Sequence, residues 1–153
     1  MVRKGRVSEL RKGRFSERGR IYHVTFTTFD RIPLFADFWL GRQVVGCMRG
    51  QESRATTLAY VIMPDHIHWL IRLESKSLSD TVKFLKGQSA CFLNKIIGRR
   101  APVWQPGFYD RAIRREEDLI AIARYIVLNP VRGGLVKSVG EYPLWDACWL
   151  ACE

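Results

Sequence analysis

The sequence predicts an α+β fold built on one antiparallel sheet. Segments with the two-residue alternation of strands and segments with helical periodicity follow one another in the order strand, helix, strand, strand, helix, strand, helix. Only Pro64 and Asp65 separate the second strand from the third, as in a hairpin. This order is that of a ferredoxin-like β-α-β-β-α-β sheet with helices on one face. We expect the additional C-terminal helix to cover the other face of the sheet.

The composition indicates one globular domain with a polyanionic partner. The chain has 153 residues, 47% of them hydrophobic, and its apolar runs are too short to span a membrane. The net charge is +10, and residues 1–20 hold eight basic against two acidic side chains. We therefore expect a basic, flexible arm over residues 1–20, followed by a domain over residues 21–153. The N-terminus has no apolar signal segment, so we expect a cytoplasmic protein without membrane contact.

The first strand and the first helix are predicted over residues 21–30 and 34–50. In the strand, apolar and polar side chains alternate: Tyr22, Val24 and Phe26 against His23, Thr25 and Thr27. Pro33 ends it, and Gly50 is a plausible end for the helix. The helix offers four side chains for burial: Phe35, Phe38, Val45 and Met48.

The central hairpin and the second helix follow. Residues 56–63 and 66–73 are rich in strand-forming side chains, and residues 77–98 have helical periodicity. Ser77 or Ser79 can cap the start of this helix, and Gly98 can end it. Its expected buried stripe is Leu78, Val82, Leu85, Phe92 and Ile96.

The last third of the chain is predicted to hold a strand, a helix and a loop. Residues 103–113 resemble a strand around a Pro-Gly bend, and residues 115–130 a helix with acids in its first turn and Pro130 as its stop. Its core stripe is Leu119, Ile122, Ala123 and Ile126. Residues 131–153 indicate a loop and a short packing segment.

Two of the three histidines, His66 and His68, lie one residue apart in the predicted third strand. Side chains two residues apart in a strand point to the same face, so both imidazoles project together. The opposite face is wholly apolar and should rest on the helices: Ile67, Trp69, Ile71 and Leu73. Two imidazoles can hold one divalent ion, but a site needs a further ligand. The pair also fits two surface histidines without a metal.

Tyr125 lies off the core stripe of the last helix, and Asn129 lies four residues later on the same flank. A phenol beside an amide that can complete a metal shell suits a tyrosine nucleophile that attacks a phosphodiester. Taken alone, Tyr125 also fits a packing residue, and an Asn before Pro130 fits an ordinary helix end.

Three segments carry a family resemblance: "MPDHIHWLI", "VWQPGFYDRAIRREEDL" and "ARYIVLNPVRGGLV". They resemble the REP-associated tyrosine transposases, single-tyrosine transposases with a His-hydrophobic-His metal site. The likeness covers residues 21–150. It implies the ferredoxin-like fold, with the added helix as the catalytic one. It also implies nicking and rejoining of single-stranded palindromic DNA hairpins through a 5′-phosphotyrosine link.

The resemblance also implies site residues and partners. Tyr125 would be the nucleophile, and His66, His68 and Asn129 would bind Mg²⁺ or Mn²⁺ with no other small-molecule cofactor. We expect a nucleoid-associated bacterial protein and favour a monomer over a dimer. Tyr109 stands where many relatives have His, which leaves its role open and offers a second tyrosine.

DNA contacts are expected from basic side chains: Arg3, Lys4, Arg6, Arg11, Lys12, Arg14, Lys83, Lys86, Arg111, Arg114 and Arg132. Trp104, Phe108 and Tyr109 could stack on unpaired bases or pack at the rim of the core. Two other functions fit the same layout. One is a basic nucleic-acid-binding module without chemistry. The other is a metal-dependent phosphodiesterase that forms no covalent link.

Overall fold

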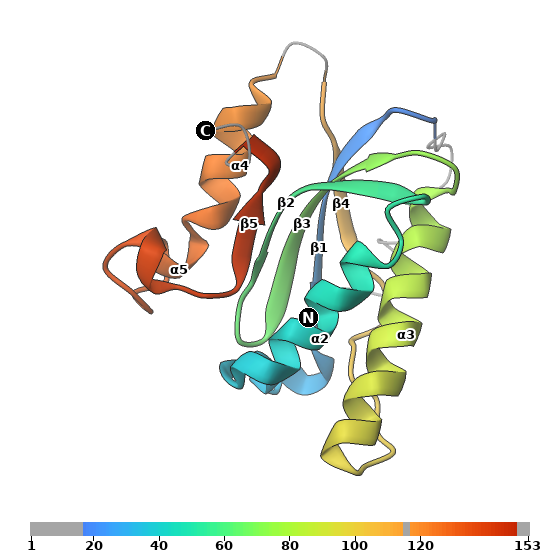
Figure 1. Ribbon diagram of the computed structural model, residues 1–153, viewed down its shortest axis with the longest axis vertical. Helices are drawn as coiled ribbons and strands as arrows, with labels where there is room; N and C mark the ends of the chain where they lie inside the picture. Colours follow the sequence, from blue (N-terminus) through green and yellow to red (C-terminus); the bar gives the residue numbers. More distant parts are fainter. Residues whose placement is uncertain (1–16, 115–116, 150–153) are drawn as a thin grey trace.

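The computed structural model describes residues 17–114 and 117–149. Within these residues, one five-stranded antiparallel sheet has the strand order β4-β1-β3-β2-β5, shown in Figure 1. The first four strands have the predicted ferredoxin-like order, and the fifth adds an edge strand beside β2. The predicted fold class is confirmed.

The central strands have the predicted faces. β1 (Ile21–Thr27) pairs with β3 (His66–Leu73), and β3 forms a hairpin with β2 (Ala55–Ile62). The apolar side chains of β3 are buried, Trp69 among them, and its indole Nε1 donates to Thr57 Oγ1 at 2.9 Å. His66 and His68 project from the other face, as the period of two predicts.

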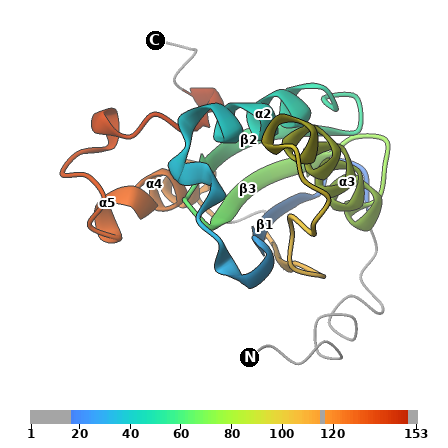
Figure 2. The same cartoon turned by 90° about the horizontal axis from the view of Figure 1, so that it is seen from below.

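Two helices cover the apolar face of the sheet. α2 (Phe38–Arg49) and α3 (Leu78–Ile97) lie side by side there, as Figure 2 shows. α2 starts later than predicted because the Asp37 carboxylate accepts hydrogen bonds from the backbone N–H groups of Trp39 and Leu40. A short 3₁₀ turn, Leu34–Ala36, replaces the first predicted turn, and Phe38 is exposed rather than buried.

The second helix has the predicted caps but a different buried stripe. The Ser77 hydroxyl accepts from the Asp80 N–H, and Gly98 ends the helix with φ +75°. Beyond Leu85 the buried positions are Ser89 and Leu93, whereas Phe92 and Ile96 are exposed. The stripe was wrong there because the buried face rotates by a residue, and Ser89 is accommodated by a hydrogen bond from its hydroxyl to the Leu85 carbonyl.

The last elements cover the histidine face only in part. β4 (Tyr109–Ala112) pairs with β1, and α4 (Leu119–Val127) packs on β2, β3 and β5 (Trp145–Ala147). The helix continues after a break as α5 (Asn129–Arg132), so Pro130 does not stop the chain from being helical. The predicted acids do not lie in the first turn of α4. Asp118 instead caps it, by accepting from two backbone N–H groups.

The sheet therefore separates two apolar clusters. The larger lies under α2 and α3, and the smaller joins α4 to the opposite face through residues such as Leu70, Ala123 and Ile126. This confirms that the additional helix covers the second face. Each helix within residues 17–114 and 117–149 is too short or too polar to span a lipid bilayer.

Two other segments add to the folded body. Gly19 N–H donates to the Leu73 carbonyl and Leu73 N–H to the Arg20 carbonyl, so the end of the predicted arm already joins the folded body. The predicted C-terminal loop contains the edge strand β5, which is too short for an alternation pattern to show.

Candidate active site

All three histidines of the chain meet on one face of the sheet. The β1–β3 register places Thr25 opposite His68, and it brings His23 Nε2 to 3.0 Å from His68 Nδ1. Thr25 Oγ1 lies 3.2 Å from the same Nδ1. The ring centroids of His66 and His68 are 5.1 Å apart. Prediction from the sequence missed His23, although its place on the polar face of the first strand was a signal.

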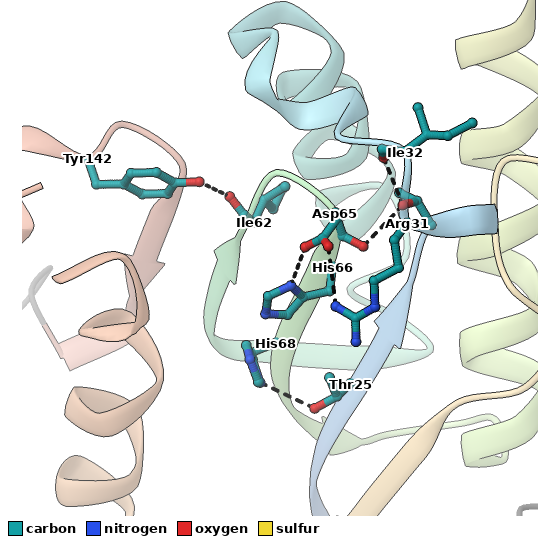
Figure 3. A network of polar contacts seen from close by, with 9 residues as sticks. Thr25, Arg31, Ile32, Ile62, Asp65, His66, His68 and Tyr142 are labelled. Atoms are coloured by element: carbon teal, nitrogen blue, oxygen red, sulfur yellow. Dashed lines mark hydrogen bonds and ion pairs between the residues drawn. The ribbon is translucent and has the colours of Figure 1, made fainter. Parts of the chain in front are cut away.

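His66 is held by a separate network, drawn in Figure 3. Its Nδ1–H donates to Asp65 Oδ1 at 2.7 Å, and Arg31 Nη1 donates to the other carboxylate oxygen at 3.2 Å. Burial by itself would raise the pKa of Asp65, but the hydrogen bonds from His66 and Arg31 lower it below its usual value. A carboxylate that accepts from Nδ1–H leaves His66 Nε2 with a free lone pair.

The other two imidazoles are neutral at physiological pH. Burial, with a smaller effect of the Arg111 charge, lowers the pKa of His23 to about 4. Burial, followed by the charges of His23, His66 and Arg132, lowers the pKa of His68 to about 3. Neutral imidazoles are the form that binds metal ions.

These pKa values predict an acid-sensitive fold. Above the usual histidine pKa of about 6.5, folded and unfolded states are both neutral at His23 and His68. As the pH falls below that value, the unfolded chain takes up protons that the folded chain does not, so unfolding becomes easier. Between pH 7 and pH 5, the free energy of unfolding should fall by roughly 2 kcal/mol per imidazole.

Urea denaturation at the two pH values measures this loss of stability. The His23→Gln variant removes one of the two titrating rings, so its loss should be about half that of the wild type. An equal loss in both proteins would contradict the assignment of the effect to these rings.

Burial separates the five tyrosines of the chain. Tyr22 and Tyr60 are in the core. The Tyr142 hydroxyl donates to the Ile62 carbonyl, and burial raises the pKa of Tyr142 to about 12. Only Tyr109 and Tyr125 are exposed, with 45% and 62% of their surfaces accessible. The tyrosine nucleophile that the family resemblance implies would therefore be one of these two.

Tyr125 is the better placed of the two, because a cation lies against it. The guanidinium carbon of Arg132 is 3.8 Å from the centroid of the Tyr125 ring, and Nη2 donates to the Tyr125 carbonyl at 2.6 Å. The charge of the same Arg132 contributes to the lowered pKa of His68, so its field reaches the histidine cluster. Tyr109, on β4, stands opposite Thr25 on the histidine face and is the other candidate for the nucleophile.

Asn129 is oriented by the proline that follows it. Pro130 has no N–H to donate to the carbonyl of Ile126, four residues earlier, and Asn129 Nδ2 donates to that carbonyl instead, at 2.8 Å. The amide oxygen of Asn129 takes no part in this hydrogen bond, so it could serve as a metal ligand. Tyr125 lies in the last turn of α4 and Asn129 is the first residue of α5, with Leu128 between the two helices, so the shared flank of the two side chains stays a prediction.

His66 and His68 can complete a site for a divalent ion only with a further ligand that is not His, Cys, Asp or Glu. Across residues 17–114 and 117–149, no group of three or more His, Cys, Asp or Glu side chains is arranged to hold a metal ion. His66 and His68 are thus a two-ligand platform. An amide oxygen such as that of Asn129 would give a mixed nitrogen and oxygen set, which suits a borderline or hard ion.

The predicted DNA-binding residues have different environments. Lys86 Nζ donates to the carbonyls of Gln105 and Gly107, which fixes the loop before β4 and occupies much of its ammonium group. Arg111 pairs with Glu117 at 2.7 Å, and Lys83, Arg114 and Arg132 are exposed. The residues of the arm lie outside the described residues: Arg3, Lys4, Arg6, Arg11, Lys12 and Arg14.

The three aromatic candidates for base stacking also differ. Trp104 and Phe108 are buried, and Trp104 Nε1 donates to Ser89 Oγ at 2.9 Å. Core packing is therefore their role, and Tyr109 alone of the three offers an exposed ring.

The family model described as "Transposase IS200 like" matches residues 18–129, which include the histidine pair, Tyr125 and Asn129. The chain belongs to this transposase family. It is 35% identical over 89 residues to the REP-associated tyrosine transposase of Escherichia coli (strain K12), a match that covers 56% of this chain and 50% of that protein. It is 33% identical over 98 residues to a protein of Haemophilus influenzae assigned to the same group, with 57% and 56% covered. The chain thus spans about half the length of the curated relatives it matches.

Solved structures of transposases share the fold. A REP-associated tyrosine transposase bound to a REP hairpin matches with a TM-score of 0.68 and 26% identity, over 86% of this chain and 79% of that one. A transposase-like protein from Deinococcus radiodurans matches with a TM-score of 0.54 and 23% identity, over 74% and 93%. The second likeness concerns the fold alone.

Proposed function

We propose that this transposase is a metal-dependent DNA strand transferase that nicks and rejoins single-stranded REP hairpins through a 5′-phosphotyrosine intermediate. One observation carries the proposal. Tyr125 is the most exposed tyrosine, and its ring lies against Arg132, whose charge also reaches the histidine pair. The relative solved with a REP hairpin supports the choice of substrate.

The proposed reaction is a phosphoryl transfer to the phenol. Tyr125 Oη attacks the scissile phosphorus, the bond from phosphorus to the 3′ oxygen breaks, and the 3′ oxygen leaves and takes up a proton while the phenol loses one. Attack by a 3′-hydroxyl on the phosphotyrosine reverses the step and rejoins the strand. The energy of the phosphodiester is kept in the protein–DNA link, so no other co-reactant is needed.

The protein groups have distinct tasks in this scheme. His66, His68 and Asn129 would hold Mg²⁺ or Mn²⁺, which supplies charge neutralisation at the scissile phosphate. Arg132 orients the Tyr125 ring and provides positive charge where the phosphate gains negative charge. The exposed basic side chains of the body and the arm would hold the DNA backbone.

A labelled single-stranded hairpin tests the proposal. With Mn²⁺ or Mg²⁺, the wild type should give a protein–DNA adduct that resists SDS and a fragment with a free 3′-hydroxyl. Chelation with EDTA should prevent both. Hairpin binding without an adduct under these conditions would contradict the proposal and leave a DNA-binding module. Cleavage without an adduct would indicate a phosphodiesterase.

A further inference from the structure

One side chain of the histidine cluster, His23, has no role in the reaction proposed above. His23 comes from β1, a different strand from that of the proposed metal ligands, and its Nε2 lies 3.0 Å from His68 Nδ1. His23 is part-buried beside His68, and their ring centroids are 5.2 Å apart. Such a contact joins two imidazoles by one hydrogen bond, and the position of its single proton decides which nitrogen of His68 is free.

Only one arrangement of that proton lets His68 serve as a ligand through its outer nitrogen. If His68 Nδ1 carries the hydrogen, it donates to His23 Nε2, and His68 Nε2 keeps its lone pair. If His23 Nε2 carries it, His68 Nδ1 is the acceptor, and the neutral His68 ring then has its hydrogen on Nε2. Outer-shell partners of this kind fix the tautomer and orientation of ligand histidines.

We propose that His23 is a positioning residue that accepts a hydrogen bond from His68 Nδ1–H and so presents His68 Nε2 to the metal ion. The inference rests on the proposed function. With this hydrogen bond, each proposed ligand donates its Nδ1–H to a neighbouring acceptor: His68 to His23, and His66 to Asp65. Thr25 Oγ1, at 3.2 Å from His68 Nδ1, is a second and weaker acceptor.

Two replacements of His23 separate this role from packing. Glutamine can place a carbonyl oxygen near the position of Nε2 and keep the acceptor, whereas leucine fills similar space without one. If His23 only packs, leucine should be tolerated at least as well as glutamine. Because Thr25 can partly take over, the His23→Leu/Thr25→Val double variant should show the full effect.

The first measurement is Mn²⁺ affinity, from the EPR signal of free Mn²⁺ in titrations of the full chain without a histidine tag. Compared with the wild type, His23→Leu should bind about tenfold more weakly and the double variant about 100-fold more weakly, in the range of lost outer-shell partners. His23→Gln should stay within about threefold of the wild type. Wild-type affinity in the double variant would overturn the proposal.

The second measurement needs no metal and separates this inference from the proposed function. With only three histidines in the chain, ¹⁵N imidazole spectra at pH 7.5 can assign the tautomer of His68 directly. The wild type should show Nδ1–H, and the double variant should shift toward Nε2–H. A wild-type His68 with its hydrogen on Nε2 would overturn the role of His23. If His66→Ala instead binds Mn²⁺ like the wild type, the metal site of the proposed function is wrong. The tautomer of His68 then tests by itself whether His23 accepts its hydrogen bond.

Discussion

Replacing Tyr125 by phenylalanine is expected to abolish the covalent adduct while the protein stays folded and binds the hairpin. The hydroxyl is the nucleophile in the proposed step, and its loss leaves no oxygen to accept the phosphate. Rates of adduct formation should fall by at least roughly 10⁴-fold, as in other losses of a nucleophile. The side chain is 62% exposed and makes its ring contact with Arg132, which phenylalanine retains, so stability should change little.

Tyr109→Phe is the matched control, because Tyr109 is the other exposed tyrosine and lies on the histidine face of the sheet. It should form the adduct at close to the wild-type rate. Gel quantification of the adduct and a mobility-shift titration, run on both variants, separate chemistry from binding. An adduct from Tyr125→Phe but not from Tyr109→Phe would exchange the roles of the two tyrosines.

His66→Ala is expected to stop cleavage almost as completely. Removing one imidazole leaves His68 as the only nitrogen donor of the proposed site, so the charge neutralisation that a bound ion provides is lost. That contribution is worth several kcal/mol, or roughly 10³-fold in rate. The replacement suits the test because His66 is the first residue of β3 and its hydrogen-bond partner, Asp65, still pairs with Arg31.

Thr27→Ala is the control for this variant. Thr27 lies directly opposite His66 in the β1–β3 register and has no proposed part in binding metal. It should cleave the labelled hairpin at close to the wild-type rate, and both variants should bind the hairpin. A His66→Ala protein that cleaves as well as Thr27→Ala would show that the reaction does not depend on this imidazole.

The sequence predicted the site to the extent that local periodicity determines it. A period of two places His66 and His68 together and buries Trp69, and a period of 3.6 places Tyr125 off the core stripe. These relations need only one element each. The element order then predicted the ferredoxin-like sheet and the covering of its second face by α4.

Features that depend on contacts beyond a single periodic pattern were not predicted from the sequence. The approach of His23 to His68 depends on the register of β1 against β3, which no pattern within either strand specifies. The division of the last helix at Leu128 follows from the backbone hydrogen bond that Pro130 cannot make, and the same defect directs the Asn129 amide. The start of α2 was misplaced because Asp37 caps the helix inside an otherwise helical pattern.

In the proposed reaction the Tyr125 phenol forms the link to DNA, and peptide mapping of the adduct tests this role most directly. Trypsin should release residues 125–132, which hold Tyr125 as their only tyrosine, whereas Tyr109 falls in residues 101–111. After nuclease digestion of the adduct, mass spectrometry should find the nucleotide phosphate on the peptide of residues 125–132. Finding it on residues 101–111 would contradict the claim.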